Sequence, residues 1–237
     1  IPRKEAPDKV TGTVKYNYDI SGPELLHCWL VTSLYGHANL KSVDTTKALE
    51  APGVKAVVTA KFFPTLVGVT LEDRPPLASG KVRYFGEPIA VVVANSEAEA
   101  HNAANLVMVE YEPLPVVNAP SDALKDGAPL VHEGLATYTV IENTPYPEPG
   151  TNIAHRQKIR KGDIVKGWAE SEVIIEGQYK LPQSDHAAME TRSVRAQINQ
   201  DGTVIIHSTS QAPFMIKTII SRSFHIEVGK IIVHTPL

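Results

Sequence analysis

Cysteine is almost absent from this chain: Cys28 is the only one among 237 residues. A single thiol excludes an intramolecular disulfide, and it excludes a zinc or iron-sulfur site built from several thiolates of this chain. The shortage of cysteine predicts a reducing, cytoplasmic setting. Because Cys28 lies in the apolar run 25–31, we expect a small buried hydrophobic side chain rather than a nucleophile.

Long apolar runs and dense patches of one charge are also missing. No apolar segment approaches the roughly 18 residues that span a bilayer, and the start does not resemble a signal peptide, so we expect a soluble protein whose natural start lies upstream of Ile1. The net charge is −3, from 23 basic and 26 acidic residues. Basic residues gather only at 155–161, which excludes a nucleic-acid face. A hydrophobic content of 43% with 21% charged residues is typical of a folded protein.

The first half of the chain alternates strand and helix patterns. Ser96 and Glu99 form a capping box, and small residues along the inner stripe of the following helix let it lie close against a sheet. The expected elements are a helix at 44–50 and strands at 54–59, 89–94 and 107–111. The expected core consists of Val57, Ile89, Val91, Val93, Leu106 and Val109.

A different pattern follows a stretch that is rich in proline and glycine. We assign 121–155 to an interdomain connection, which we expect to lie over a surface of its own chain or of a partner. Beyond it, Asp201-Gly202 is typical of a hairpin turn, and alternation of period two predicts mainly antiparallel strands. The expected elements are strands at 173–180, 194–198, 204–208 and 229–233, with a helix at 213–225.

Short phrases in a fixed order connect the chain to a known family. They are Lys9-Val-Thr-Gly12, Leu26-His27, His37-Ala38, Pro52-Gly-Val54, Pro76-Leu-Ala78, the run Val82 to Pro88 and the run Val109 to Pro115. Four later residues extend the pattern: Gln183, His186, Glu190 and Gln211. Together they resemble the molybdenum hydroxylases, the large subunits of the xanthine dehydrogenase, aldehyde oxidoreductase and carbon monoxide dehydrogenase family.

The resemblance implies an α+β fold. It divides the chain into an α/β hammerhead domain at 1–120, the connection at 121–155, and the N-terminal part of the first molybdopterin-binding domain at 156–237. The implied reaction is hydroxylation of an aldehyde or an N-heterocycle with oxygen from water. The molybdenum cofactor, molybdopterin, supplies that chemistry in the complete enzyme, and [2Fe-2S] clusters and FAD are expected on partner domains or subunits.

Gln211 is the one cofactor-binding residue that the resemblance implies, because a glutamine in the matching place reaches the molybdenum centre. It follows a strand and precedes a helix, where side chains tend to face a ligand. A neutral amide offers both a donor and an acceptor to a molybdenum-bound oxo group. His186 and Glu190 provide only two ligands, so we expect a hydrogen-bonded structural pair and no metal site.

No catalytic residue is assigned to this chain. The family's Gly-Gly-Phe-Gly loop and its glutamate base would lie beyond residue 237, so we expect the chain alone to be inactive and to bind no molybdenum, iron or flavin. A truncated chain or gene and one polypeptide of a split large subunit both fit. The alternative is a noncatalytic assembly module or decayed fragment that reuses the hammerhead fold. We further expect residues 156–237 to be the less stable half and to drive oligomerisation through exposed apolar surface.

Overall fold

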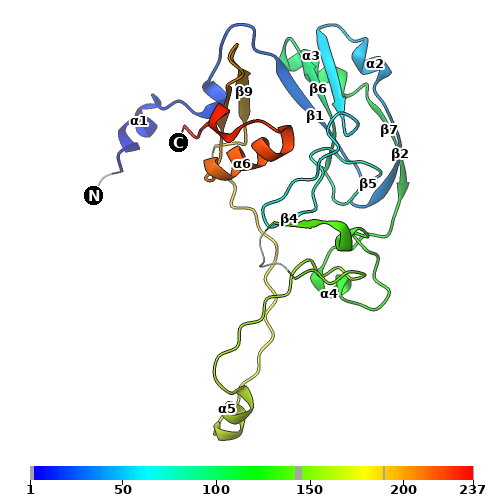
Figure 1. Ribbon diagram of the computed structural model, residues 1–237, viewed down its shortest axis with the longest axis vertical. Helices are drawn as coiled ribbons and strands as arrows, with labels where there is room; N and C mark the ends of the chain where they lie inside the picture. Colours follow the sequence, from blue (N-terminus) through cyan, green and yellow to red (C-terminus); the bar gives the residue numbers. More distant parts are fainter. Residues whose placement is uncertain (1–2, 142–145, 189, 237) are drawn as a thin grey trace.

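Three three-stranded sheets and one two-stranded sheet form the framework of the chain in a computed structural model, which describes residues 3–141, 146–188 and 190–236. Two of the three-stranded sheets belong to the first half of the chain and the third belongs to the last quarter. A long two-limbed arm, which contains residues 159–181, projects away from both parts (Figure 1). The expected α+β class is therefore confirmed, with helices and mainly antiparallel sheets.

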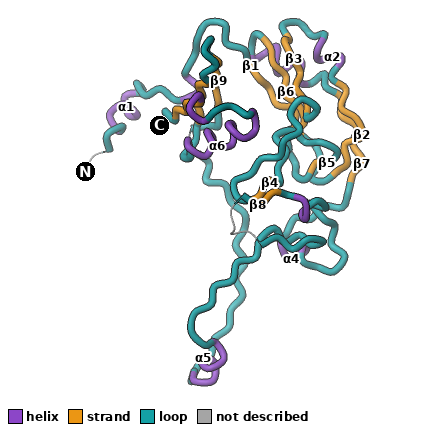
Figure 2. The backbone as a smooth tube through the Cα atoms, in the orientation of Figure 1, coloured by secondary structure: helices purple, strands orange, loops and turns teal. Residues whose placement is uncertain are grey.

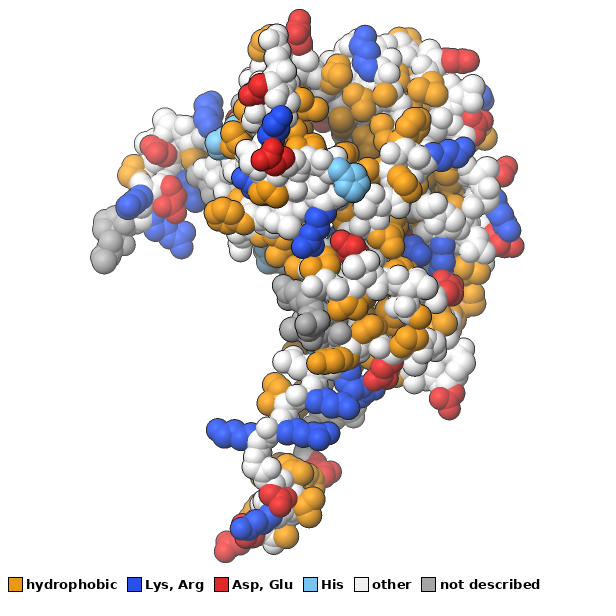
Figure 3. Space-filling view, viewed as in Figure 1, with side chains coloured by type: hydrophobic (Ala, Val, Ile, Leu, Met, Phe, Trp, Pro, Cys, Tyr) orange, Lys and Arg blue, Asp and Glu red, His pale blue; other side chains and the backbone are white. Residues whose placement is uncertain are grey.

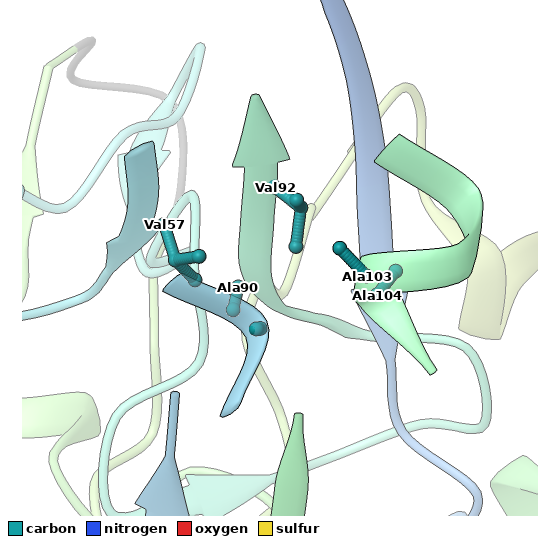
Figure 4. Close-up of a cluster of buried hydrophobic side chains, with 6 residues drawn as sticks. Val57, Ala90, Val92, Ala103 and Ala104 are labelled. Atoms are coloured by element: carbon teal, nitrogen blue, oxygen red, sulfur yellow. The ribbon is translucent and has the colours of Figure 1, made fainter. Parts of the chain in front are cut away.

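The first sheet has the strand order β1-β6-β3, with both pairings antiparallel. Its strands are β1 (His27–Thr32), β3 (Val54–Thr59) and β6 (Pro88–Ala94). It is covered by α2 (Thr46–Leu49) and α3 (Glu97–Ala104). The Ser96 side chain accepts a hydrogen bond from the Glu99 amide, as the capping pattern predicts. Figure 4 shows the small side chains of α3 facing the central strand, and they bring the helix close to the sheet.

Alanine and valine side chains form the core beneath α3, and a second cluster lies under the next sheet. The first cluster is Ala48, Val57, Ala90, Val92, Ala103 and Ala104. The second sheet has the order β5-β2-β7, from β2 (Ala38–Asp44), β5 (Lys81–Val82) and β7 (Met108–Pro113). Its cluster is Ala38, Ala78, Val82 and Ile89.

The expected core is correct in part. Val57 and Ile89 are buried, whereas Val91, Val93 and Val109 are half-buried. The prediction that Leu106 is buried is wrong, since this residue is 41% exposed. It follows the end of α3 and its amide bonds back to the Ala103 carbonyl, so a closing turn directs it away from the inner stripe. The helix expected at 44–50 shortens to α2.

The proline-rich connection lies over the first half of its own chain. It contains α4 (Pro120–Ala123), a 3₁₀ turn η2 (Leu135–Thr137) and β8 (Thr139–Val140), which pairs with β4 (Leu71–Glu72). The buried Lys81 ammonium donates to the Leu130 carbonyl at 2.9 Å and forms an ion pair with Glu133. These contacts fasten the connection to β5.

The third sheet combines an antiparallel hairpin with a parallel strand. Its strands are β9 (Val194–Ile198), β10 (Val204–Ser208) and β11 (Ile231–His234), and α6 (Pro213–Phe224) and η3 (Val228–Lys230) link the last two. The hairpin is confirmed, with Gly202 at φ +80° in its turn. The mainly antiparallel expectation leaves room for β11, which runs parallel to β10 because α6 carries the chain back to the start of the sheet.

The strand expected at 173–180 is absent from the described ranges, and this is the largest correction. Residues 172–182 have no strand partner there and run along one limb of the arm, with α5 (Ile164–Glu170) at its tip (Figure 2). At the other end of the chain, a 3₁₀ turn η1 (Asn17–Asp19) contacts β9, whereas α1 (Ala6–Thr11) stands away from the third sheet (Figure 1). No helix in the part of the chain that the structure describes has the length and apolarity needed to cross a bilayer.

Candidate functional site

Gln211 lies in the four-residue loop between β10 and α6, with its side chain exposed. Among the hydrogen bonds of the described residues, none involves the Gln211 carboxamide. Ser210 fixes the loop by accepting a hydrogen bond from the Ala212 amide at 3.0 Å, and Pro213 then opens the helix. The loop therefore holds the Gln211 backbone in place while leaving its carboxamide available to a ligand.

A polar network beneath this loop connects it to the N-terminal segment. The Thr209 amide donates a hydrogen bond to the Ser193 carbonyl, and the Ser193 amide donates to the Thr209 hydroxyl at 3.1 Å. The Ser193 hydroxyl accepts from the Asn17 side chain at 2.8 Å, and the Asn17 amide donates to the Glu190 carboxylate at 3.2 Å. Asn17 is only 3% exposed. The N-terminal segment thus helps to position the loop that carries Gln211.

A row of three basic side chains crosses the sheet face opposite α6. His207, four residues before Gln211, pairs with Arg195 on β9 and with His234 on β11. The two imidazole rings stack with their centroids 4.9 Å apart. Partial burial, together with the nearby His234 and Arg195, lowers the pKa of His207 below its usual value. Arg195 therefore carries the permanent positive charge of the row, and its charge disfavours the protonated form of His207.

The start of α6 adds a second positive influence at the loop. This helix has 12 residues, and no side chain caps its first amides. Its N-terminal amides and dipole favour a negative group near Gln211. With an uncharged donor and acceptor at Gln211 and the N-terminus of α6 two residues further on, the arrangement suits binding and orienting an anionic group.

The other candidate residues are placed apart from this loop or in different roles. His186 and Glu190 do not pair among the described residues: His186 lies 3.4 Å from Asp185, and Glu190 accepts a hydrogen bond from the Asn17 backbone amide. Cys28 is exposed on β1 rather than buried, and partial burial of its thiol raises its pKa. In the described ranges, no three histidine, cysteine or acidic side chains gather as a metal site.

Two structural contributors were missed by sequence reasoning. Asn17 gives no local signal, because its partners Glu190 and Ser193 are more than 170 residues away. The row of Arg195 and His207 could have been found by continuing the hairpin register from Asp201-Gly202. Three further histidines lie at ordinary structural positions: His101 is exposed and its ring contacts Trp29 in a tilted arrangement, and His27 and His207 lie in strands.

Two cavities lie away from Gln211. One, of about 480 Å³, lies among loop 67–74, His155 and Ile219 of α6. Another, of about 340 Å³, lies beneath the connection and includes Asp73 and His132. Gln211 lines neither of these two cavities.

Comparison with known families decides the assignment. Residues 11–115 match the aldehyde oxidase and xanthine dehydrogenase a/b hammerhead domain, and residues 146–237 match the molybdopterin cofactor-binding domain. The chain belongs to the molybdenum hydroxylase family. This hydroxylase chain is 36% identical over 242 residues to a probable xanthine dehydrogenase polypeptide of Bacillus subtilis (strain 168), in a match that covers all of the chain and 30% of that protein.

Solved structures agree with the assignment of this hydroxylase chain. The aldehyde oxidoreductase from Desulfovibrio gigas matches with a TM-score of 0.82 and 29% identity, over 100% of this chain and 26% of that one. Quinoline 2-oxidoreductase from Pseudomonas putida 86 also matches with a TM-score of 0.82, at 28% identity, over 98% of this chain and 29% of that one. The chain thus spans less than a third of the length of these relatives.

The residues present fit one side of a molybdopterin cofactor. The exposed Gln211 carboxamide offers a hydrogen bond without adding charge, and the start of α6 favours an anionic partner. When bound, the cofactor supplies the oxidation-reduction chemistry. In such a complex, the residues of this chain would help to bind and orient it.

Proposed function

We propose that this chain forms part of the large subunit of a molybdenum-dependent hydroxylase that oxidises an aldehyde or an N-heterocycle. The observation that supports it best is the exposed carboxamide of Gln211, which has no hydrogen-bond partner among the described residues. A fixed loop holds it inside the segment that matches the molybdopterin cofactor-binding domain. In this proposal Gln211 donates a hydrogen bond to the molybdenum centre. The 15–30% share of length that the chain covers in xanthine dehydrogenase-type relatives fits a partial subunit.

The proposal also covers domains, partners and setting. Residues 1–120 would form the hammerhead domain, 121–155 the connection, and 156–237 the first part of the cofactor-binding domain. The partners would be the remainder of the molybdenum subunit and the iron-sulfur and flavin subunits or domains. Relatives named as members of complexes support this, among them "6-hydroxypseudooxynicotine dehydrogenase complex subunit gamma" of Paenarthrobacter nicotinovorans. A cytoplasmic setting is supported by the single cysteine.

The test is metal analysis of the natively purified assembly that contains this chain, combined with a substitution at Gln211. We expect molybdenum and pterin to co-elute with the chain. Gln211→Ala should lower the turnover of an aldehyde or N-heterocycle about 10- to 100-fold while the molybdenum content falls less. Gln197→Ala is the matched control, because Gln197 is an exposed glutamine on β9 of the same sheet.

Two results would contradict the proposal. One is a natively purified assembly without molybdenum or pterin. The other is equal turnover for the Gln211→Ala and Gln197→Ala proteins, which would show that Gln211 does not face the reacting group.

A further inference from the structure

The cavity of about 340 Å³ beneath the connection, here called the connection cavity, is formed entirely by residues between 73 and 154. It therefore depends on neither the third sheet nor the arm, and it lies apart from Gln211. Its polar lining includes Asp73, Asn118 and His132, and its apolar lining includes Val117, Val131 and Leu135. Its volume falls within the range of about 300–1,000 Å³ that is typical of small-molecule sites.

One side chain, Asn152, holds the wall of the connection cavity together. Its carboxamide donates to the Ala123 carbonyl at 3.2 Å and to the Pro129 carbonyl at 3.0 Å. Its oxygen accepts a hydrogen bond from the Val131 amide at 2.9 Å. Because these bonds join separate turns of the connection, the cavity has its shape before any ligand enters. A ligand would therefore lose little free energy to the ordering of the wall.

Asp73 brings to the cavity a carboxylate that has no hydrogen bond or ion pair among the described residues. Its backbone is fixed by a tight turn, in which Arg74 and Val67 exchange two hydrogen bonds at 2.8 and 3.2 Å. A side chain at Gly68 would collide with the Leu71 carbonyl, so the turn closes only around a glycine. Arg74 itself is exposed and lines the other cavity instead. The turn thus holds a free carboxylate at the connection cavity.

His132 is held near this carboxylate by Tyr138. The His132 Nδ1 lies 3.0 Å from the Tyr138 hydroxyl, and the two rings meet edge to face with their centroids 5.6 Å apart. The pairing of β4 with β8 places Glu72 opposite Thr139. Asp73 and Tyr138, the next residues in that register, therefore lie at the same end of the small sheet.

The protonation of His132 leaves one of its nitrogens for a ligand. Burial lowers the pKa of His132, which favours the neutral imidazole. When its proton is on Nδ1, this nitrogen donates to the Tyr138 oxygen and Nε2 becomes an acceptor. The Nε2 atom has no hydrogen-bond partner in the part of the chain that the structure describes. The cavity therefore offers two acceptors, a carboxylate and an imidazole nitrogen.

The neighbouring cations already have acidic partners. Lys81 forms an ion pair with Glu133, and the Arg83 guanidinium lies 4.0 Å from the Glu87 carboxylate. On the face that Figure 3 shows, acidic and basic groups are interspersed over the first half of the chain, so no broad field of one sign selects the charge of a ligand there. The selection is therefore local, and Asp73 favours a cation.

We propose that the connection cavity binds a small organic cation that carries an amidinium or guanidinium group on an apolar body. Two parallel N–H groups of this planar cation donate to the Asp73 carboxylate, and another donates to the His132 Nε2. The apolar body packs against Val131 and Leu135. A delocalised cation of this kind is more weakly hydrated than an ammonium ion, so it enters a partly apolar cavity at a lower cost. The proposal is independent of the Gln211 site.

The first test titrates the full chain with benzamidine by calorimetry, beside benzamide and benzoate. The three probes share a ring but differ in charge. We expect benzamidine to bind with a Kd of about 1 mM or below, and the other two to bind at least about tenfold more weakly. No binding of benzamidine would overturn the proposal. Equal binding of benzamide would also overturn it, because the apolar wall alone would then hold the ring.

The second test removes the charge of Asp73. Asp73→Asn should weaken benzamidine binding about 10- to 100-fold, because it removes a charged bidentate partner. Asp126→Asn is the matched control, since Asp126 is exposed in the connection and lines neither cavity. His132→Phe keeps a ring but removes the nitrogen acceptor, and it should weaken binding about tenfold. Thermal midpoints of the free variants show that each one folds. Equal affinities of the two aspartate variants would overturn the proposal.

The third test separates a small ligand from an arginine side chain of a partner, which would supply the same group. The titration is repeated with the natively purified assembly that contains this chain. We expect benzamidine to bind with the same affinity and to slow amide hydrogen exchange at 131–135. Loss of binding in the assembly would overturn the proposal, because a partner would then fill the cavity.

Discussion

The two parts of the molecule bury their apolar side chains to different degrees. The first half buries two clusters beneath two sheets, and α3 lies directly on its strands. The second part, within the described ranges, has one cluster of three buried residues, an open face on its sheet and a free arm. Both parts have ordinary hydrophobic sequences. The difference teaches that apolar patterning completes a domain only when the chain also supplies the surfaces that cover it.

The largest effect should come from the core of the first half. Val92→Asp places an unpaired carboxylate at a fully buried position, at a cost of several kcal/mol against a total stability of about 5–15 kcal/mol. We expect the chain to lose cooperative thermal unfolding. Val165→Asp, at a position 77% exposed in α5, is the control and should melt normally. A Val92→Asp protein that melts at the wild-type midpoint would contradict the view that the first half is the more stable part.

A core substitution in the third sheet should have a smaller and local effect. Ile206→Ala removes a large part of its three-residue cluster and should cost about 2–5 kcal/mol there. Hydrogen exchange should become faster in β9, β10 and β11 while the β6 amides stay protected. If β6 is affected equally, the two parts unfold together and the comparison fails.

The network around Asn17 tests which part the N-terminal segment stabilises. Asn17→Ala removes the hydrogen bond to the Ser193 hydroxyl and should cost about 1 kcal/mol. Because Ser193 adjoins β9, we expect faster exchange in the third sheet and no change in β6. Asn105→Ala, in an exposed position after α3, is the control. Faster exchange confined to β1 and β6 would place the segment with the first half instead.

The smallest effect concerns pH. Burial lowers the pKa of His132, with a further contribution from the positive charge of Arg83. The folded state therefore binds fewer protons there than the unfolded state, so its stability is present above the ordinary histidine pKa of about 6.5 and is lost as pH falls through the lower folded value. Between about pH 7.5 and about pH 5.5, His132→Asn should reduce the loss of stability measured by chemical denaturation. An unchanged pH slope would show that His132 is not the group responsible.

Local signals in the sequence were enough where neighbours in the chain determine the structure. Ser96 and Glu99 lie three residues apart and begin α3, and Asp201-Gly202 closes the hairpin of β9 and β10. The position of Gln211 between a strand and a helix was predicted in the same way, because both neighbouring elements have clear periodicity. Its contact with molybdenum stays a prediction.

Other features depended on residues that are distant in sequence. Asn17 is buried only because Glu190 and Ser193 meet it. Cys28 lies in an apolar run of the sequence, yet it is exposed, since α3 covers the opposite face of β1. No window of sequence contains these partners.

The sequence by itself determined most of the elements, the hairpin, the family resemblance and the alternation at 172–182. Only the tertiary structure decided that β11 runs parallel to β10, that the N-terminal segment joins the third sheet, and that 172–182 has no strand partner among the described residues. The physical reason is that periodicity states which face of a segment must be buried, whereas a strand exists only when a second backbone supplies its hydrogen bonds.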